Sequence, residues 1–227
     1  MIKSFLILIS LTLILFSCSK KEEQKLNPDI GSGYAGLEVG KWVVYNVDSI
    51  TYDDFDNSID TASYQIRELV DSKFLDLGDD EAFKIIRYRR DSDTLAWDII
   101  DVWSSKLTAT SFQKTEENIK YLKLILPVKE SKTWNGNSMN NQSSILYEFD
   151  FVDQSKIIGG ISLGNVLRVI QGGEDGLDNL INPTFFEEKY AKGIGLVYKR
   201  STDKVRSALN SPWKGYDVIM TLSSSGG

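Results

Sequence analysis

The stretch Ile145–Leu146–Tyr147–Glu148–Phe149–Asp150–Phe151 places an apolar side chain at every second position. Residues two apart on a β-strand share one face, so the isoleucine and the three aromatic rings would form a core face, with the two carboxylates opposite. A second stretch, Lys41–Trp42–Val43–Val44–Tyr45–Asn46–Val47–Asp48–Ser49–Ile50–Thr51, is rich in β-branched and aromatic residues and follows a glycine. Together the two stretches predict a β-rich body.

Runs of the same kind recur along the chain, separated by turn-forming clusters of Asp, Asn, Gly and Ser. The predicted strands are 41–51, 61–70, 82–90, 95–103, 107–114, 119–126, 144–152, 161–171, 185–192, 194–200 and 216–222. No long window shows the period of about 3.6 residues that marks an amphipathic helix. About eleven short strands with hairpin-length connections predict an all-β antiparallel meander, which forms either an open, lipocalin-like barrel or a two-sheet sandwich.

The position of each tryptophan relative to these runs predicts whether it is buried or exposed. Trp42 and Trp134 each open a strand after a short polar turn, and we expect both to plug the core. Trp97 and Trp103 lie inside predicted strands, where core packing is the commoner fate of a large ring. Trp213 follows a Ser-Pro pair in a predicted loop, which makes it the candidate exposed aromatic and the candidate ligand contact.

The amino-terminal segment has the layout of a secretory signal. Cys18, the only cysteine, follows an apolar run from Phe5 to Phe16 and the small residue Ser17, and Lys3 supplies the positive start. The run is too short for a transmembrane helix, which needs about 20 apolar residues. The residues after the cysteine are charged, so nothing extends the run.

Leu15–Phe16–Ser17–Cys18 resembles the lipobox of bacterial lipoproteins. The resemblance implies cleavage between Ser17 and Cys18, attachment of a diacylglycerol to the Cys18 thiol, and acylation, typically with palmitate, of the new amino group. Two or more acyl chains, at about 0.8 kcal/mol per buried CH₂, would hold the protein on a membrane. The membrane is therefore the first expected partner.

Lys21–Glu22–Glu23 resembles the export signal that follows the lipidated cysteine of Bacteroidetes-type lipoproteins. In that family the signal directs the protein to the outer face of the outer membrane. The resemblance implies a surface-exposed, lipid-anchored protein of the outer membrane. The periplasmic face is the alternative, because an ordinary charged tether has a similar composition.

The chain is predicted to divide into a signal peptide over residues 1–17, a lipidated cysteine with a flexible tether over 18–36, and one β-rich domain over 37–227 that ends in a short flexible tail. Loss of the signal removes Lys3 and leaves 25 basic and 32 acidic residues, a net charge of −7. Nucleic acid is not expected as a partner, because affinity for phosphate backbones comes from clustered Lys and Arg.

The composition argues against catalysis. The chain has no histidine, and its one cysteine is assigned to lipid, so the commonest general base, the commonest transition-metal ligand and a thiol nucleophile are all missing. Glu187 and Glu188 are adjacent on a predicted strand and face opposite ways, unlike a glycosidase pair. The acidic stretch 53–60 lacks the glycine and the bidentate glutamate of an EF-hand. We expect no enzyme activity, no cofactor and no metal site.

The body also resembles a group of uncharacterised Bacteroidetes-type lipoproteins in the stretches 39–45, 126–129, 132–136 and 190–198. This resemblance supports the fold class and implies no activity. Two functions stay open. The first is a binding or envelope-accessory module whose loops engage a glycan, a peptide or a partner protein on a β scaffold. The alternative is a carrier of an apolar ligand or lipid in an open barrel, which requires an interior void lined by Ile125, Phe149 and their neighbours.

Overall fold

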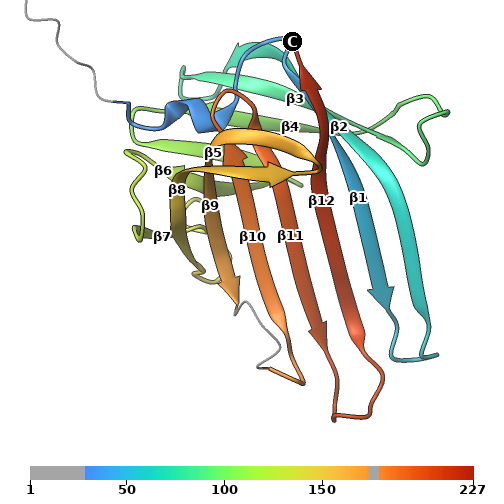
Figure 1. The fold of residues 1–227 in the computed structure, drawn as a ribbon. Coiled ribbons are helices and arrows are strands. Elements are labelled where there is room, and N and C mark those ends of the chain that lie inside the picture. Colours follow the sequence, from blue (N-terminus) through green and yellow to red (C-terminus); the bar gives the residue numbers. More distant parts are fainter. Residues whose placement is uncertain (1–28, 174–178) are drawn as a thin grey trace, which may run out of the picture.

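The computed structural model describes residues 29–173 and 179–227, whose fold is drawn in Figure 1. Within these ranges the chain forms one short 3₁₀ turn, η2 (Ser32–Ala35), and twelve strands. The strands are β1 (Trp42–Tyr52), β2 (Ile59–Leu75), β3 (Glu81–Arg90), β4 (Asp98–Leu107), β5 (Ser111–Glu116), β6 (Ile119–Ile125), β7 (Thr133–Asn135), β8 (Leu146–Ile158), β9 (Ile161–Gly173), β10 (Thr184–Ala191), β11 (Gly195–Val205) and β12 (Lys214–Gly226). None of the helical structure in the described ranges is long and apolar enough to cross a bilayer.

All twelve strands belong to one sheet in the order β6-β5-β4-β3-β2-β1-β12-β11-β10-β9-β8-β7. The sheet curls until its two end strands meet. The Leu122 amide in β6 donates to the carbonyl of Gly136, which follows β7, at 2.9 Å, and the Trp134 indole donates to the Leu122 carbonyl at 2.9 Å. The predicted all-β class is confirmed, and of the two arrangements left open the molecule adopts the nearly closed barrel.

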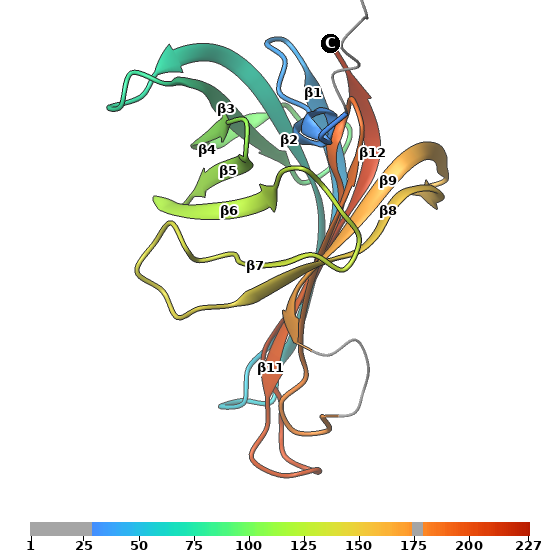
Figure 2. The same ribbon diagram turned by 90° about the vertical axis from the view of Figure 1, so that its left-hand side faces the viewer.

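The view in Figure 2 separates the two sides of this sheet. Strands β3 to β6 curl over one face of the layer formed by β10, β11, β12 and β1, and the end of the β8–β9 hairpin lies over the opposite face. At that end Gly159 adopts a φ of 58°, and a Cβ built on it would lie 2.0 Å from the Leu222 carbonyl oxygen of β12. Only glycine allows so close an approach of two backbones.

The alternation that predicts β8 is present in the structure. Tyr147 and Phe149 are buried, whereas Glu148 and Asp150, which follow them one by one, are partly exposed. The twelfth strand, β7, was not predicted. Its three residues are too few to show alternation, and its sequence continues into Asn-Gly, which is typical of a turn.

The predicted tether ends earlier than residue 36. Residues 32–35 form η2, and Tyr34 within it is fully buried and donates its hydroxyl to Asp153 Oδ1 at 2.7 Å. The Val128 amide also donates to the Ile30 carbonyl at 3.0 Å. The glycines around Tyr34 suggested a flexible leash, but a single buried ring is enough to bring this segment into the folded body. Figures 1 and 2 place η2 at the end of the barrel that carries the C-terminus.

The predicted flexible tail at the C-terminus is wrong. Strand β12 continues to Gly226, with Ser225 paired to Val43 and Gly226 paired to Trp42 of β1. The run of serines and glycines is typical of a tail. Ladder hydrogen bonds use backbone groups, however, so these residues pair wherever β1 offers a free edge.

Trp134 is in the core, as predicted. It is 7% exposed, and its ring centroid lies 4.5 Å from that of Phe149. Trp42 does not plug the core. Its neighbour Val43 faces the barrel interior, so Trp42 faces outward, where it is half-buried beneath the Arg67 guanidinium at 5.5 Å from the ring centroid.

Trp97 and Trp103 also differ from the prediction, because both are only half-buried. Each lies beneath an arginine: Arg90 is 4.4 Å from the Trp97 ring centroid, and Arg87 is 3.7 Å from that of Trp103. A stacked guanidinium covers a ring face as an apolar side chain would, and sequence alone does not reveal that pairing.

Candidate functional site

A row of ion pairs crosses the interior of the barrel. We call it the ion row, and its members are Glu68, Lys114, Glu116, Lys123, Glu188 and Lys199. Lys123 on β6 and Glu188 on β10 lie far apart in the sheet order, yet Lys123 Nζ is 2.9 Å from Glu188 Oε1. Their exposed fractions are 3% and 1%. Glu188 Oε2 accepts hydrogen bonds from Gln171 Nε2, at 2.6 Å, and from the Tyr190 hydroxyl. The pair therefore has the partners that a buried charge needs.

Glu116 on β5 continues the row and is surrounded by three ammonium groups. Its Oε1 lies 3.1 Å from Lys123 Nζ and 3.9 Å from Lys114 Nζ. Its Oε2 lies 3.8 Å from Nζ of Lys199 on β11, and the same ammonium group is 3.6 Å from Glu188. The row thus links strands from both halves of the sheet.

Glu68 on β2 ends the row. Lys114 Nζ donates to Glu68 Oε2 at 2.8 Å, and Arg87 Nε donates to Oε1 at 3.1 Å. The Arg87 guanidinium stacks on the Trp103 ring, which also lies 4.8 Å from Lys114 Nζ. Both oxygens of this carboxylate are therefore paired.

The row shifts the pKa values of its members. Burial by itself raises the pKa of Glu116, but the three surrounding ammonium groups outweigh it and hold that pKa far below its usual range. The pKa values of Glu68 and Glu188 are lowered by the same balance between burial and neighbouring cations. Burial lowers the pKa of Lys123, and the carboxylates beside it raise that pKa more. These three glutamates and Lys123 are charged at neutral pH.

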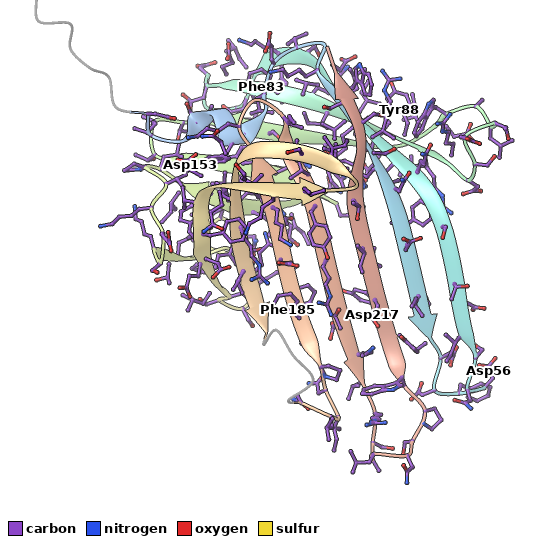
Figure 3. All side chains as sticks on the ribbon, viewed as in Figure 1. Asp56, Phe83, Tyr88, Asp153, Phe185 and Asp217 are labelled. Carbon is purple, nitrogen blue, oxygen red and sulfur yellow. The ribbon has the colours of Figure 1, made fainter. Side chains whose placement is uncertain are left out.

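A cavity of about 360 Å³ opens next to the row, at the end of the barrel away from η2. We call it the mouth pocket. Its lining includes Tyr121, Tyr147, Phe186, Lys199, Ser201 and Tyr216. Figure 3 labels Phe185 on β10 and Asp217 on β12, the strands that contribute Phe186 and Tyr216 to the lining. The volume falls in the range of roughly 300–1,000 Å³ that ligand sites occupy.

Several polar groups of the mouth pocket have no protein partner. Within the described ranges, the hydroxyls of Tyr121, Tyr147, Tyr216 and Ser201 make no hydrogen bond, and none of these oxygens is sealed from solvent without a partner. A tyrosine presents an apolar ring and a polar tip together. The pocket can therefore offer both stacking faces and hydrogen-bonding groups to a ligand.

The opposite end of the interior is covered by η2. A cavity of about 50 Å³ lies beneath η2, lined by residues such as Leu37, Val70 and Phe112. Phe149 is fully buried against Trp134, and neither it nor Ile125 lines this cavity or the mouth pocket. The interior around Ile125 and Phe149 is thus packed, which favours the binding-module hypothesis over the apolar carrier.

Trp213 lies outside the mouth pocket. It is half-buried near the tip between β11 and β12, with Arg206 at 4.3 Å and Lys204 at 5.4 Å from its ring centroid. It lines a separate hollow of about 180 Å³ with residues of the β1–β2 tip, and that hollow shares no lining residue with the mouth pocket. Trp213, the predicted ligand contact, is therefore partly exposed, but the side chains of Arg206 and Lys204 already lie against its ring.

The other residues singled out by the sequence fall in different places. Ser17, Cys18, Lys21, Glu22 and Glu23 lie outside the described residues, so the lipidation and export predictions remain predictions.

Glu187 and Glu188 do face apart, as expected for neighbours on a strand. Glu188 points into the interior row, whereas Glu187 pairs with Arg168 and Lys189. The acidic stretch 53–60 covers the tip of the β1–β2 hairpin and the first two residues of β2. At the tip, Asp53 and Asp56 accept hydrogen bonds from the backbone amides two residues on, at 2.8 and 2.9 Å. These are turn-forming contacts.

Sequence reasoning missed the ion row. Its members come from five strands, and Lys123 and Glu188 are 65 residues apart in the chain. One signal was present in the sequence, because Lys123 stands between Leu122 and Leu124 in a strongly apolar run. A lysine at such a position indicates a buried cation in need of an anion, although nothing local identifies the partner.

Comparison with known proteins gave no matching family model and no matching curated protein. Two solved structures are similar in overall fold. A candidate exported protein with a YmcC-like fold from Bacteroides fragilis is 12% identical, with a TM-score of 0.40, over 82% of this chain and 97% of that one. A candidate lipoprotein from Parabacteroides distasonis is 10% identical, with a TM-score of 0.43, over 85% of this chain and 98% of that one. Both similarities concern the overall outline alone, and they assign no function to this chain.

Proposed function

We propose that this chain is a lipid-anchored, non-enzymatic binding protein of the bacterial envelope, and that it holds a hydroxyl-rich polar ligand, such as a glycan, in the mouth pocket. One observation carries the proposal: a pocket of ligand size is lined by aromatic rings and by hydroxyls that form no hydrogen bond with any described residue. Pockets of this kind combine a mainly apolar or aromatic lining with a few polar groups that set orientation.

The lining suits a molecule with both apolar and polar faces. The rings of Phe186 and Tyr216 can pack against the C–H faces of a sugar ring. The hydroxyls of Tyr121, Tyr147 and Ser201 can donate to or accept from the hydroxyls of that ring. A peptide with hydroxyl or carboxyl side chains would use the same groups, so the proposal concerns the chemistry of the ligand rather than one compound.

An apolar ligand fits the interior less well. The charged row stands between the mouth pocket and the small cavity beneath η2, so an alkyl chain entering from the mouth would meet Glu116 and Lys123. An alkyl chain that displaced polar partners of these buried ions would offer no hydrogen bond or opposite charge in return, and this is energetically unfavourable. This is the reason for preferring a polar ligand to a lipid.

The fold supports one orientation on the membrane. The described chain begins at Asp29, whose carboxylate lies 3.1 Å from Lys192 Nζ, close to η2 at the closed end of the barrel. A lipid on Cys18 would therefore attach to that end through a tether of about ten residues. The mouth pocket would then open away from the membrane, on the cell surface or, as the alternative, in the periplasm.

The proposal is tested by titration calorimetry on the full chain, purified from membranes in detergent, with a panel of oligosaccharides and with palmitate. We expect binding to oligosaccharides. The variants Tyr121→Phe and Tyr216→Phe keep the ring and remove one hydroxyl, so each should weaken binding by roughly 2- to 10-fold, the value of one net hydrogen bond of about 0.5–1.5 kcal/mol.

Tyr88→Phe is the matched control, because Tyr88 lies on β3 beneath Arg67 and outside the mouth pocket. It should bind as the unmodified chain does. Binding to palmitate with no response to any hydroxylated compound would overturn the proposal in favour of the apolar carrier.

A further inference from the structure

We propose that the mouth pocket selects ligands that carry an anionic group, and that Lys199 binds this group. The inference rests on the proposed function and adds the charge of the ligand. The shared chemistry is a carboxylate or phosphate attached to a hydroxylated scaffold.

Lys199 is the accessible cation of the ion row. Its side chain is 28% exposed, compared with 4% for Lys123 and 10% for Lys114. Its ammonium nitrogen lies 3.6 Å from Glu188 and 3.8 Å from Glu116, which is beyond the usual range of 2.7–3.2 Å for a hydrogen bond. No described residue accepts a hydrogen bond from it, so its three N–H donors are available to a ligand.

The nearby carboxylates are already held by closer donors. Glu188 Oε1 accepts from Lys123 at 2.9 Å, and its Oε2 accepts from Gln171 and Tyr190. Glu116 is closer to Lys123, at 3.1 Å, than to Lys199. Lys199 is therefore attracted to Glu116 and Glu188 by charge, but its ammonium group forms a hydrogen bond with neither carboxylate.

The charge of the lining points the same way. The charged residues that line the mouth pocket are Glu116, Lys123 and Lys199, which sum to +1 in a chain whose net charge is −6. A cationic ligand would have to displace one of the ammonium groups around Glu116. An anionic ligand meets an uncommitted ammonium group beside hydroxyl donors, the arrangement of a charge-assisted hydrogen bond.

A lysine ammonium acts as a point charge, so it does not by itself distinguish a carboxylate from a phosphate. The experiment therefore uses two matched pairs. Calorimetry on the full chain compares trigalacturonic acid with its methyl ester, and glucose 6-phosphate with glucose. Within each pair the sugar scaffold is constant. Esterification removes the negative charges of trigalacturonic acid, and glucose lacks the phosphate group of glucose 6-phosphate.

We expect the charged member of at least one pair to bind roughly tenfold or more tightly than its neutral partner, as a charge-assisted hydrogen bond implies. Lys199→Gln should abolish that preference, and Lys199→Arg should retain most of it. Lys156→Gln is the control, since it makes the same change of net charge on β8, outside the mouth pocket. Circular dichroism of each variant checks that the barrel is intact.

Preference for the acid alone would identify a carboxylate, and preference for glucose 6-phosphate alone a phosphate; both outcomes support the inference. Equal binding of charged and neutral members, or a preference that survives Lys199→Gln, would overturn it. If equal binding is still weakened by Tyr216→Phe, the proposed function stands and only the charge selection is wrong. If no hydroxylated probe binds, the proposed function fails and the inference fails with it.

Discussion

Lys123 occupies a core position on β6, between Leu122 and Leu124, which are both buried. The alternation of a strand predicts that one of every two residues faces the core, but it does not predict a charge there. The residue was identifiable from the sequence as unusual, whereas its partners Glu116 and Glu188 were not, because they lie on other strands. Local pattern determines the face of a residue, and only the closed sheet determines its partners.

Lys123→Met should destabilise the protein by about 3–5 kcal/mol, because it leaves buried carboxylates without their cation. Lys123→Met combined with Glu188→Gln should cost less than the sum of the two single changes, since the neutral pair leaves fewer buried charges unpaired. Urea unfolding followed by tryptophan fluorescence measures each free energy of unfolding.

Lys120→Met is the control, on the exposed side of the same strand, and should change stability by less than about 0.5 kcal/mol. A cost below about 1 kcal/mol for Lys123→Met would contradict a buried, functional role for the ion row.

The pH dependence of stability follows from the same residues. The pKa values of Glu68, Glu116 and Glu188 are lower in the folded chain than the value of about 4.3 expected for an unfolded glutamate. Their contribution is therefore present in full above the unfolded pKa and is lost as the pH falls through the folded values. The free energy of unfolding should stay level from about pH 7 to pH 6 and fall steadily below about pH 5. Urea titrations at several pH values test this, and stability that holds or rises between about pH 5 and pH 3 would argue against the ionised row.

At the scale of elements, the strands were largely predictable and the ends of the chain were not. The long alternating run that became β8 is confirmed by the burial of Tyr147 and Phe149. The segments at both ends of the body, η2 and the last residues of β12, looked flexible because glycine and serine are common in them. Tertiary contacts hold both segments in place: the buried ring of Tyr34 anchors η2, and pairing with the edge of β1 orders the end of β12.

Tyr34, which was expected in the tether, is fully buried, whereas Trp42, which was expected in the core, is half-buried on the outer face. Tyr34→Ala should cost about 3–5 kcal/mol, as the loss of a fully buried large ring does. Trp42→Ala should cost clearly less, about 1–2 kcal/mol, because the ring is half-buried on the outer face. Thermal and urea unfolding of the two variants show which substitution costs more stability. A larger loss for Trp42→Ala than for Tyr34→Ala would indicate that Trp42 is a core residue and that η2 contributes little to stability.

For the whole molecule, η2 covers one end of the barrel, close to where the described chain begins, and the mouth pocket lies at the other end. The sequence predicted a binding module on a β scaffold but expected recognition in loops such as that of Trp213. The mouth pocket escaped prediction because its lining comes from β5, β6, β8, β9, β10, β11, β12 and the connection between β7 and β8, which are spread along the chain from Glu116 to Tyr216. The separation of residues along the sequence does not predict which strands face each other across a closed sheet.

Cys18→Ala should abolish labelling with palmitate and leave the precursor uncut. Replacing Lys21, Glu22 and Glu23 with alanine should keep the lipid and reduce digestion of the protein when intact cells are treated with protease. Palmitate labelling that persists without Cys18 would refute the lipid anchor, and unchanged digestion would refute the export signal alone.

The most direct test of a ligand site in the mouth of the barrel is a crystal structure of the chain with the tightest-binding compound from the calorimetric panel. We expect ordered ligand density in the mouth pocket, with the ligand against the Tyr216 ring and an anionic group within hydrogen-bond distance of Lys199 Nζ. Ligand density confined to the hollow beside Trp213, or inside the packed region around Phe149, would contradict this expectation.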